Sequence, residues 1–167
     1  MGSLNSARFG IPFLAAGQAQ KELTHNEALV RIDAALHASV ESAGLDTPVL
    51  DPNPGLCWIV GNSPTGAWAG QAGAIACWTE AGWRFVPALE GTSAWLKDEQ
   101  LWAVRESGGW VIGHVRAARV SVDGQQVIGS RGAAVTAPVG GATVDEEARS
   151  AIAAILDRLA EHGLIEA

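Results

Sequence analysis

The sequence predicts an α+β protein. It has an N-terminal amphipathic helix, a central antiparallel β meander or small barrel rich in tryptophan and glycine, and a short C-terminal helix with a coiled-coil-like seam. Three observations predict this class. Apolar residues recur at three- and four-residue steps near both ends of the chain. Between these segments, short apolar runs alternate with glycine turns. The chain is 48% hydrophobic and only 17% charged, so we expect a packed core rather than disorder.

Residues 1–44 are predicted to form a lead-in and a helix that serve in oligomerisation or anchoring. Residues 7–17 are apolar and interrupted by Pro12, which favours an extended segment lying on another part of the chain. A helix of about four turns follows, as its apolar spacing indicates.

The boundaries of this first helix have sequence signals. Thr24 and Glu27 have the spacing of a capping box, and Gly44 is the expected C-terminal stop. The helix carries a single apolar stripe, which we interpret as an oligomer interface formed by Leu29, Ile32, Leu36 and Val40.

Residues 45–131 are predicted to form a tryptophan-rich β domain. It opens with a loop that holds three prolines between residues 45 and 55. Tight hairpin turns are expected at Ser107-Gly108-Gly109 and at Asp123-Gly124. The strand-like runs before the last turn are LCWIV, GAWAG, AIACW, WRFVP, SAWL, LWAVRE and WVIGH.

The C-terminal segment is predicted to be a linker, residues 132–143, followed by a helix, residues 144–167. Thr143 and Glu146 have capping-box spacing, and Gly163 is a C-terminal stop. This helix carries a coiled-coil-like seam that consists of Ala148, Ile152, Ile155 and Leu159. Isoleucine in both core layers of the seam favours trimers or tetramers over dimers. The alternative is that this apolar stripe packs on the chain's own sheet.

The seven tryptophans all lie in the β domain. Large rings dominate the packing of a small sheet, so Trp58, Trp78, Trp83 and Trp110, which lie inside alternating runs, are predicted core residues. The other three are candidates for a carbohydrate-binding surface, with core packing as the alternative: Trp68, Trp95 and Trp102.

Composition excludes several classes of partner. The net charge is −7, and the eleven basic residues are scattered among eighteen acidic ones, which argues against a nucleic acid or an anionic membrane surface. The four histidines form no pair at ligand spacing, so no metal or other cofactor is expected. Cys57 and Cys77 are expected to be buried thiols, with a disulfide left open. No membrane-spanning run or signal peptide is found, so we expect synthesis in the cytoplasm.

The sequence contains no recognisable catalytic motif. A nucleophile elbow, a Walker loop, a dinucleotide fingerprint and a metalloprotease helix are all missing. Glu80 and Glu90 are the one conceivable glycosidase pair, and two surface carboxylates explain them more simply. We therefore assign no catalytic residues and expect a protein that is not an enzyme.

Several strings resemble a known family. ARFGIPFLAAGQAQKELTHNEALVRIDAALHASVES resembles the opening of an uncharacterised domain family of α-proteobacterial phage tail-fibre and gene-transfer-agent head-spike or fibre proteins. The rest of that domain is resembled by GAWAG, IACWTEAGWRFVPALEG and LWAVRESGGWVIG. VDGQQVIGSRGAAV with the last helix resembles the tail of such proteins. The resemblance implies a subunit of a phage-like particle that contacts other capsid or tail proteins and helps attach the particle to the host surface or its capsular polysaccharide.

The sequence and the resemblance together predict a homo-oligomeric spike or fibre subunit, a trimer, that is incorporated into a released particle. A carbohydrate-binding module that uses exposed tryptophans is the alternative. A capsule depolymerase is a third and weaker hypothesis, because the resemblance brings no catalytic residues.

Overall fold

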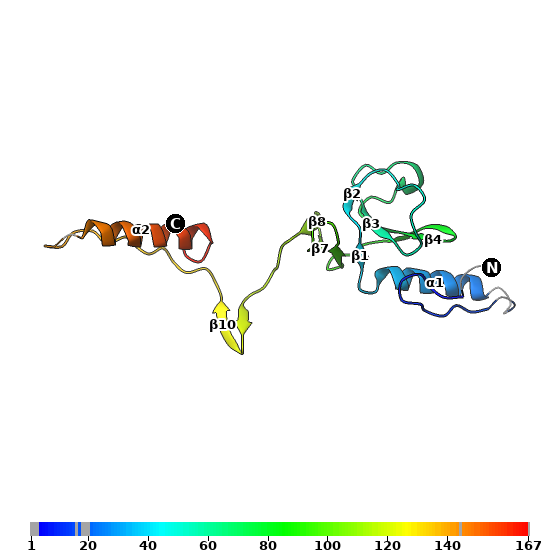
Figure 1. Ribbon diagram of the computed structural model, residues 1–167, viewed down its shortest axis with the longest axis horizontal. Coiled ribbons are helices and arrows are strands. Elements are labelled where there is room, and N and C mark those ends of the chain that lie inside the picture. Colours follow the sequence, from blue (N-terminus) through cyan, green and yellow to red (C-terminus); the bar gives the residue numbers. More distant parts are fainter. Residues whose placement is uncertain (1–3, 16, 18–20, 144, 167) are drawn as a thin grey trace. The chain divides into compact units, whose positions relative to one another are not determined.

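The chain divides into two compact units, Met1–His114 and Val115–Ala167, each described here by itself. The computed structural model (Figure 1) describes residues 4–15, 17, 21–143 and 145–166. Part of the first family-like string, Gln18–Gln20, therefore lies outside the described residues.

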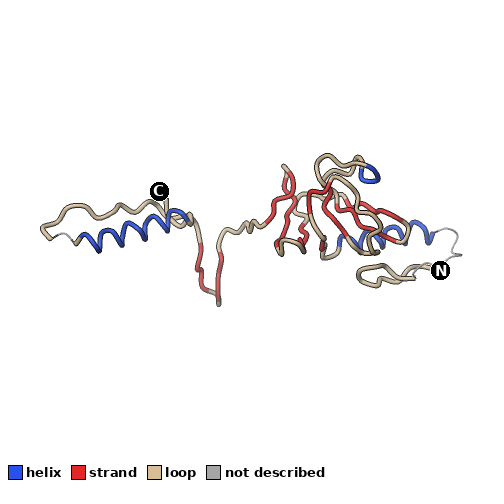
Figure 2. The backbone as a smooth tube through the Cα atoms, turned by 45° about the horizontal axis from the view of Figure 1, so that its top comes forward, coloured by secondary structure: helices blue, strands red, loops and turns tan. Residues whose placement is uncertain are grey.

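The N-terminal unit combines one α-helix with two four-stranded sheets (Figure 2). The sheet orders are β2-β3-β4-β5 and β1-β6-β7-β8. The predicted α+β class is confirmed, and the sheets form no closed barrel among the described residues. The elements are α1 (Lys21–Ala35), β1 (Ser39–Val40), β2 (Ala43–Leu45), β3 (Cys57–Val60), η1 (Gly66–Trp68), β4 (Ile75–Thr79), β5 (Gly82–Val86), β6 (Ser93–Leu96), β7 (Leu101–Glu106) and β8 (Gly109–Ile112).

Most strand pairs are antiparallel neighbours in sequence, as the glycine punctuation predicts. β1 and β2, which each lie at one edge of a sheet, differ in direction. β1 pairs parallel with β6, and β2 pairs parallel with β3. The predicted strand GAWAG is wrong, since Gly66–Trp68 forms the 3-10 helix η1.

Two apolar clusters hold this unit together. The first mixes residues from both sheets and from the end of α1, including Val40, Ile59, Ile75, Leu96 and Ala103. The second lies on the other face of the β2-β3-β4-β5 sheet, where Trp58 and Val60 pack with Trp68 and Trp83. Successive residues of β3 therefore enter the two clusters in turn. This is expected for a strand that is buried on both faces, because its side chains alternate between them.

The boundaries of α1 differ from the sequence prediction. Thr24 lies inside the helix, so the predicted capping box is wrong. The helix ends at Ala35, nine residues before Gly44, and His37 takes the left-handed conformation with φ 43°. Val40 is consequently not on the helical stripe but is a fully buried residue of β1.

The N-terminal strap, residues 4–15, explains why the helix ends there. The guanidinium of Arg8 donates hydrogen bonds to four backbone carbonyls at the end of α1, those of Asp33, Ala34, Leu36 and His37. The last carbonyls of a helix have no intrahelical partner, and they carry partial negative charge. Arg8 therefore supplies the C-terminal cap from a distant part of the chain.

Asp33 fixes the strap in return. Its buried carboxylate accepts hydrogen bonds from the Ser6 hydroxyl at 2.7 Å, from the Arg8 amide at 2.9 Å and from the Phe9 amide at 2.8 Å. Asn26, two turns earlier, exchanges two hydrogen bonds with the backbone of Leu14. The expectation that the lead-in lies on another part of the chain is thus confirmed for the described residues.

The C-terminal unit contains a hairpin and a helix. β9 (Val120–Val122) and β10 (Gln125–Ile128) are joined at Asp123-Gly124, where both residues have positive φ, as predicted for a tight turn. This hairpin groups with the last helix, so the division falls after His114 rather than after residue 131. Residues 132–143 contain no helix or strand.

The helix α2 (Glu146–Glu161) is capped at both ends. Asp145, not Thr143, is the N-cap, and its carboxylate accepts from the Ala148 amide at 2.9 Å. At the other end Gly163 has φ 71°, and the amides of Gly163 and Leu164 donate to Ala160 and Leu159. This is a Schellman motif, which confirms the predicted stop. No helix within the described ranges has the length and apolar character needed to cross a bilayer.

We expect Asp33→Ala to lower the free energy of unfolding by about 2–4 kcal/mol, because buried hydrogen bonds to a charged acceptor are lost. Denaturant titration of the purified protein measures this change. Glu99→Ala, which also removes one negative charge but at an exposed site, is the matched control. Equal stability of the two variants would contradict the role given to Asp33.

Candidate functional site

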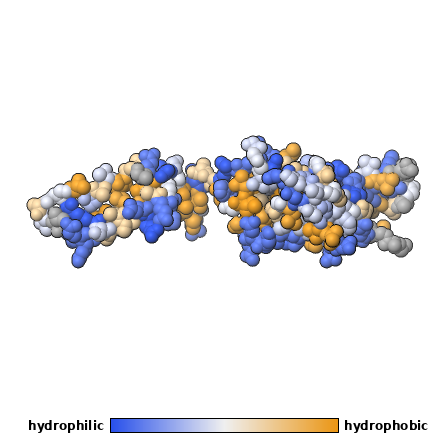
Figure 3. Space-filling model, turned by 90° about the horizontal axis from the view of Figure 1, so that it is seen from above, coloured by the Kyte–Doolittle hydropathy of each residue, from blue (hydrophilic) through white to orange (hydrophobic). Residues whose placement is uncertain are grey.

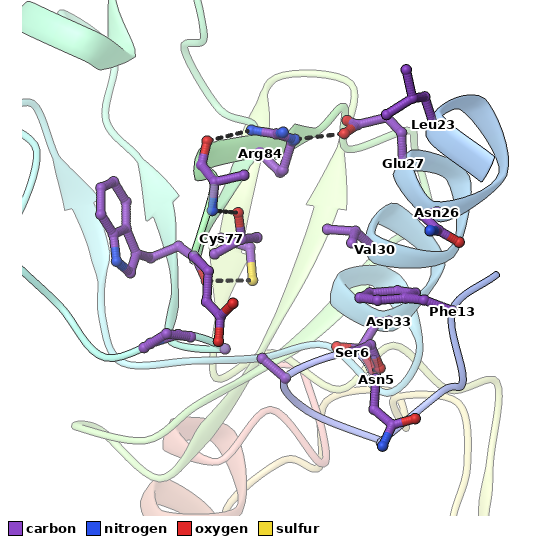
Figure 4. Close-up of a pocket in the computed structure, with 17 residues that line it drawn as sticks. Asn5, Ser6, Phe13, Leu23, Asn26, Glu27, Val30, Asp33, Cys77 and Arg84 are labelled. Carbon is purple, nitrogen blue, oxygen red and sulfur yellow. Dashed lines mark hydrogen bonds and ion pairs between the residues drawn. The ribbon is translucent and has the colours of Figure 1, made fainter. Parts of the chain in front are cut away.

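A pocket of about 630 Å³ lies in the N-terminal unit between the strap, α1 and the β4-β5 hairpin (Figure 4). Ser6 and Phe13 line it from the strap, and Val30 lines it from the helix. Cys77 and Arg84 form the strand side.

An ion pair crosses the pocket from helix to sheet. Glu27 on α1 accepts a 2.6 Å hydrogen bond from the guanidinium of Arg84 on β5 and a second bond, at 3.2 Å, from Arg31. Burial raises the pKa of Glu27, but the hydrogen bonds and charges of Arg84 and Arg31 outweigh it and hold the pKa below its ordinary value. Glu27 therefore stabilises the contact between α1 and the sheet, the role that replaces the predicted capping box.

Three acidic residues line the pocket: Glu27, Asp33 and Glu80. The two α1 carboxylates that line it, Glu27 and Asp33, are both engaged within the chain. Glu80 lines the pocket and Glu90 does not, so the pocket does not bring the conceivable glycosidase pair together. Across the residues that are described, no three or more histidine, cysteine, aspartate or glutamate side chains gather as a metal site.

Two of the three candidate carbohydrate residues lie side by side. Trp95 on β6 and Trp102 on β7 are direct cross-strand partners, with ring centroids 5.5 Å apart and planes inclined at 69°. Trp102 is 50% exposed and Trp95 is half-buried. Their immediate neighbours Ala94 and Ala103 are fully buried on the opposite face of the sheet. The pair is therefore an outward-facing aromatic surface.

Trp68 is excluded from that surface, which corrects the prediction. It is fully buried in η1 and packs edge-on against Trp83 with centroids 5.0 Å apart. An indole enclosed in the core cannot cover a sugar ring. The four predicted core tryptophans are confirmed as members of the two clusters or packed against them: Trp58, Trp78, Trp83 and Trp110.

The predicted interface residues of the first helix divide into two groups. Ile32 and Leu36 are exposed and Leu29 is half-buried, so this part of the stripe is available at the surface. Val40 is not available, because it is buried in the chain's own core against the second sheet. The helix instead faces the sheet and the strap with Asn26, Glu27, Val30 and Asp33.

The seam of α2 is largely uncovered. Ile152 is 41% exposed, Ile155 is 57% exposed and Leu159 is half-buried. No residue of this helix is buried. Across the described part of the C-terminal unit, residues 115–143 and 145–166, no residue reaches the buried class. On the face drawn in Figure 3, this unit presents exposed apolar surface, coloured orange.

Sequence reasoning missed the contact between the strap and α1 beside the pocket. Arg8 and Asp33 are 25 positions apart, and neither belongs to a local motif. The signal that could have revealed this contact is Asp33, a charged residue that lies beside the buried Ala34. Such a residue indicates a buried polar partner without identifying it.

The fold and the pocket define a small α+β domain in which two sheets share a core and a strap crosses the single helix. Residues 25–111 match the family described as "Protein of unknown function (DUF2793)". The match covers more than half of the 167 residues, so the chain belongs to this family. It runs from within α1 to within β8 and lies inside the N-terminal unit. No curated protein matches the chain.

The Glu27–Arg84 pair gives a pH dependence that can be measured. The folded-state pKa of Glu27 is depressed, so its contribution is complete above the ordinary value of 4.5 and is lost as the pH falls through the lower folded-state pKa. We expect Glu27→Gln to be less stable than wild type at neutral pH and the gap to narrow under acid conditions. Denaturant midpoints at several pH values test this, with Glu99→Gln as the control. A gap that stays constant with pH would contradict the assignment.

Proposed function

We propose that this protein is a homo-oligomeric, non-enzymatic structural subunit of a phage-like particle, a head spike or tail fibre of a gene transfer agent or phage. In this proposal it helps attach the particle to the host surface or its capsule. The observation that carries the oligomeric part is the C-terminal unit, whose described residues include none that is buried.

A segment of this kind lacks the means to stabilise itself. Burying an isoleucine side chain contributes about 1.5–3 kcal/mol, and an isolated two-stranded hairpin is marginal in water. α2 leaves Ile152 and Ile155 exposed, and the β9-β10 hairpin leaves Val122, Val127 and Ile128 exposed. Association with other chains would bury these side chains and supply the missing core.

Copies of the same chain are the partners that the helix favours. Ala148, Ile152, Ile155 and Leu159 are spaced four, three and four residues apart, as in a coiled-coil seam. Isoleucine in both layers favours three or four strands, and cyclic association of identical chains is the usual form of a soluble oligomer. We therefore propose a trimer with the α2 helices at its centre.

The first helix offers a second apolar surface. Ile32 and Leu36 lie one turn apart and are exposed, and Leu29 precedes them on the same face. Phe9 of the strap is also exposed, with its ring 6.5 Å from that of His37 just after the helix. In the proposal this surface contacts a sister chain or another particle protein.

The particle itself is proposed from sequence resemblance. In the N-terminal unit, the longer strings that resemble particle proteins cover most of the strap, α1, β1, β4, β5, β7 and β8. The family match, residues 25–111, overlaps them from within α1 onward. The net charge of −7 supports a protein partner rather than a nucleic acid. In this proposal the chain is made in the cytoplasm and joins other capsid or tail proteins in a released particle.

We expect the purified chain to have about three times the monomer mass of 17.3 kDa in light scattering coupled to size-exclusion chromatography. Ile152→Asp or Ile155→Asp places a charge in the seam, and each is expected to give monomers. Ala154→Asp adds the same charge on the opposite side of α2 and should leave the oligomer intact. A monomeric wild type would contradict the proposal.

A carbohydrate-binding module is the second candidate, favoured by the Trp95–Trp102 pair. An exposed indole covers the apolar face of a sugar ring, and its N–H reaches a hydroxyl. The two roles are compatible, since a particle subunit that binds host capsule would need such a surface.

We expect Trp102→Ala to weaken binding to capsular polysaccharide by about tenfold or more, as for the loss of an aromatic anchor. A glycan array followed by titration with purified capsule measures this change. Leu50→Ala, at another exposed apolar site, is the control. Absence of any glycan signal in wild type would eliminate this second role, and release of reducing ends from capsule would overturn the non-enzymatic assignment.

A further inference from the structure

Cys57 and Cys77 occupy directly opposed positions on neighbouring antiparallel strands. Cys57 of β3 pairs with Cys77 of β4 in the register of the sheet. The Trp78 amide donates to the Leu56 carbonyl at 2.9 Å, so the adjoining Cys57–Cys77 pair is of the non-hydrogen-bonded type. In such pairs the Cα atoms are about 4.5 Å apart, which is within the range that a disulfide spans.

Both side chains point to the same face of the sheet. Both thiols are free and nearly fully buried, and both belong to the core cluster that joins the two sheets. The Cys57 thiol donates to the Gly55 carbonyl at 3.5 Å, and the Cys77 thiol donates to the Trp78 carbonyl at 3.9 Å. No backbone movement is needed to bring the two β-carbons to facing positions.

One of the two thiols has a route to solvent. Cys77 lines the pocket between the strap, α1 and the β4-β5 hairpin, and its sulfur is labelled in Figure 4. Cys57 does not line that pocket. Cys77 is therefore the cysteine of the pair that lies on the pocket side.

We propose that Cys57 and Cys77 form a cross-strand disulfide when the folded protein meets a small peroxide. The thiolate of Cys77 attacks one oxygen of hydrogen peroxide, the O–O bond breaks, and a sulfenic acid and hydroxide form. The sulfur of Cys57 then attacks the sulfenic sulfur, and its proton leaves with the departing hydroxyl as water. Overall, two thiols and one hydrogen peroxide give one disulfide and two waters.

The electrostatics of the pair agree with these separate roles. The pKa of Cys57 is raised, first by its interaction with the neighbouring Cys77 thiol and then by burial. The pKa of Cys77 is lowered, first by its interaction with the Cys57 thiol and also by the charge of Arg8, although burial and the charge of Asp33 act against this. Cys77 is therefore the thiol that ionises first, and the thiolate is the form that reacts with peroxide.

The bond would connect the two strands that hold the N-terminal unit together. β3 supplies residues to both apolar clusters, and β4 pairs with it on one side and with β5 on the other. A crosslink between them restricts the unfolded chain and raises the midpoint of thermal unfolding by several degrees. The inference does not depend on the particle function, although a released particle is where oxidants persist.

Intact-mass spectrometry of the full-length protein tests the proposal. The reduced protein is exposed to hydrogen peroxide under native conditions, quenched, denatured and treated with an alkylating agent. We expect the mass to fall by that of two hydrogen atoms. We also expect no alkylation, because the disulfide would consume the only two cysteines in the sequence. The thermal midpoint should rise and return to its original value after reduction.

The order of reaction is tested with single variants. Cys57→Ser is expected to gain oxygen at Cys77, while Cys77→Ser should stay unmodified at the same peroxide dose. Wild-type protein that still alkylates at both thiols would overturn the proposal. A disulfide that joins two chains, or one that forms only in denaturant, would also overturn the proposal. These outcomes are measured on the wild-type protein, so they do not depend on the folding of a variant.

Discussion

The N-terminal unit depends on one reciprocal contact, in which Arg8 caps the end of α1 while Asp33 of that helix holds the strap. The carboxylate of Asp33 accepts from two strap amides and the Ser6 hydroxyl, and the guanidinium of Arg8 donates to the backbone carbonyls at the end of the helix. Each partner satisfies polar groups that would otherwise be buried without hydrogen bonds. The helix consequently stops at Ala35, and β1 enters the second sheet four residues later.

The strap and the helix that it binds also line the pocket beside Cys77. The strap lies on α1, and α1 is fixed to β5 by the Glu27–Arg84 pair, so the space between them remains open above Cys77. On the side of α1 that lines the pocket, Asn26 and Asp33 bind the strap and Glu27 binds β5. Ile32 and Leu36 are exposed.

Local signals in the sequence predict much of this fold, and long-range contacts account for the failures. Glycine turns predict β3 to β8 and the β9-β10 hairpin, and Gly163 predicts the end of α2. The end of α1 and the strands β1 and β2 are missed, because the cap comes from Arg8 and both strands are defined by parallel partners far along the chain. Of the candidate surface, the Trp95–Trp102 pair is found on the surface, whereas Trp68 and Val40 are core residues, since burial is set by the packing of both sheets.

The two units differ in how far each provides its own core. The N-terminal unit encloses two apolar clusters, while the described residues of the C-terminal unit enclose none. The central claim is that sister chains supply the missing core around α2. Hydrogen–deuterium exchange of the intact protein over a range of concentrations tests it most directly. The account predicts that amides of Glu146–Glu161 gain protection as the chain associates, while those of β3 and β4 do not change. Equal and strong protection of α2 in dilute monomers would contradict it.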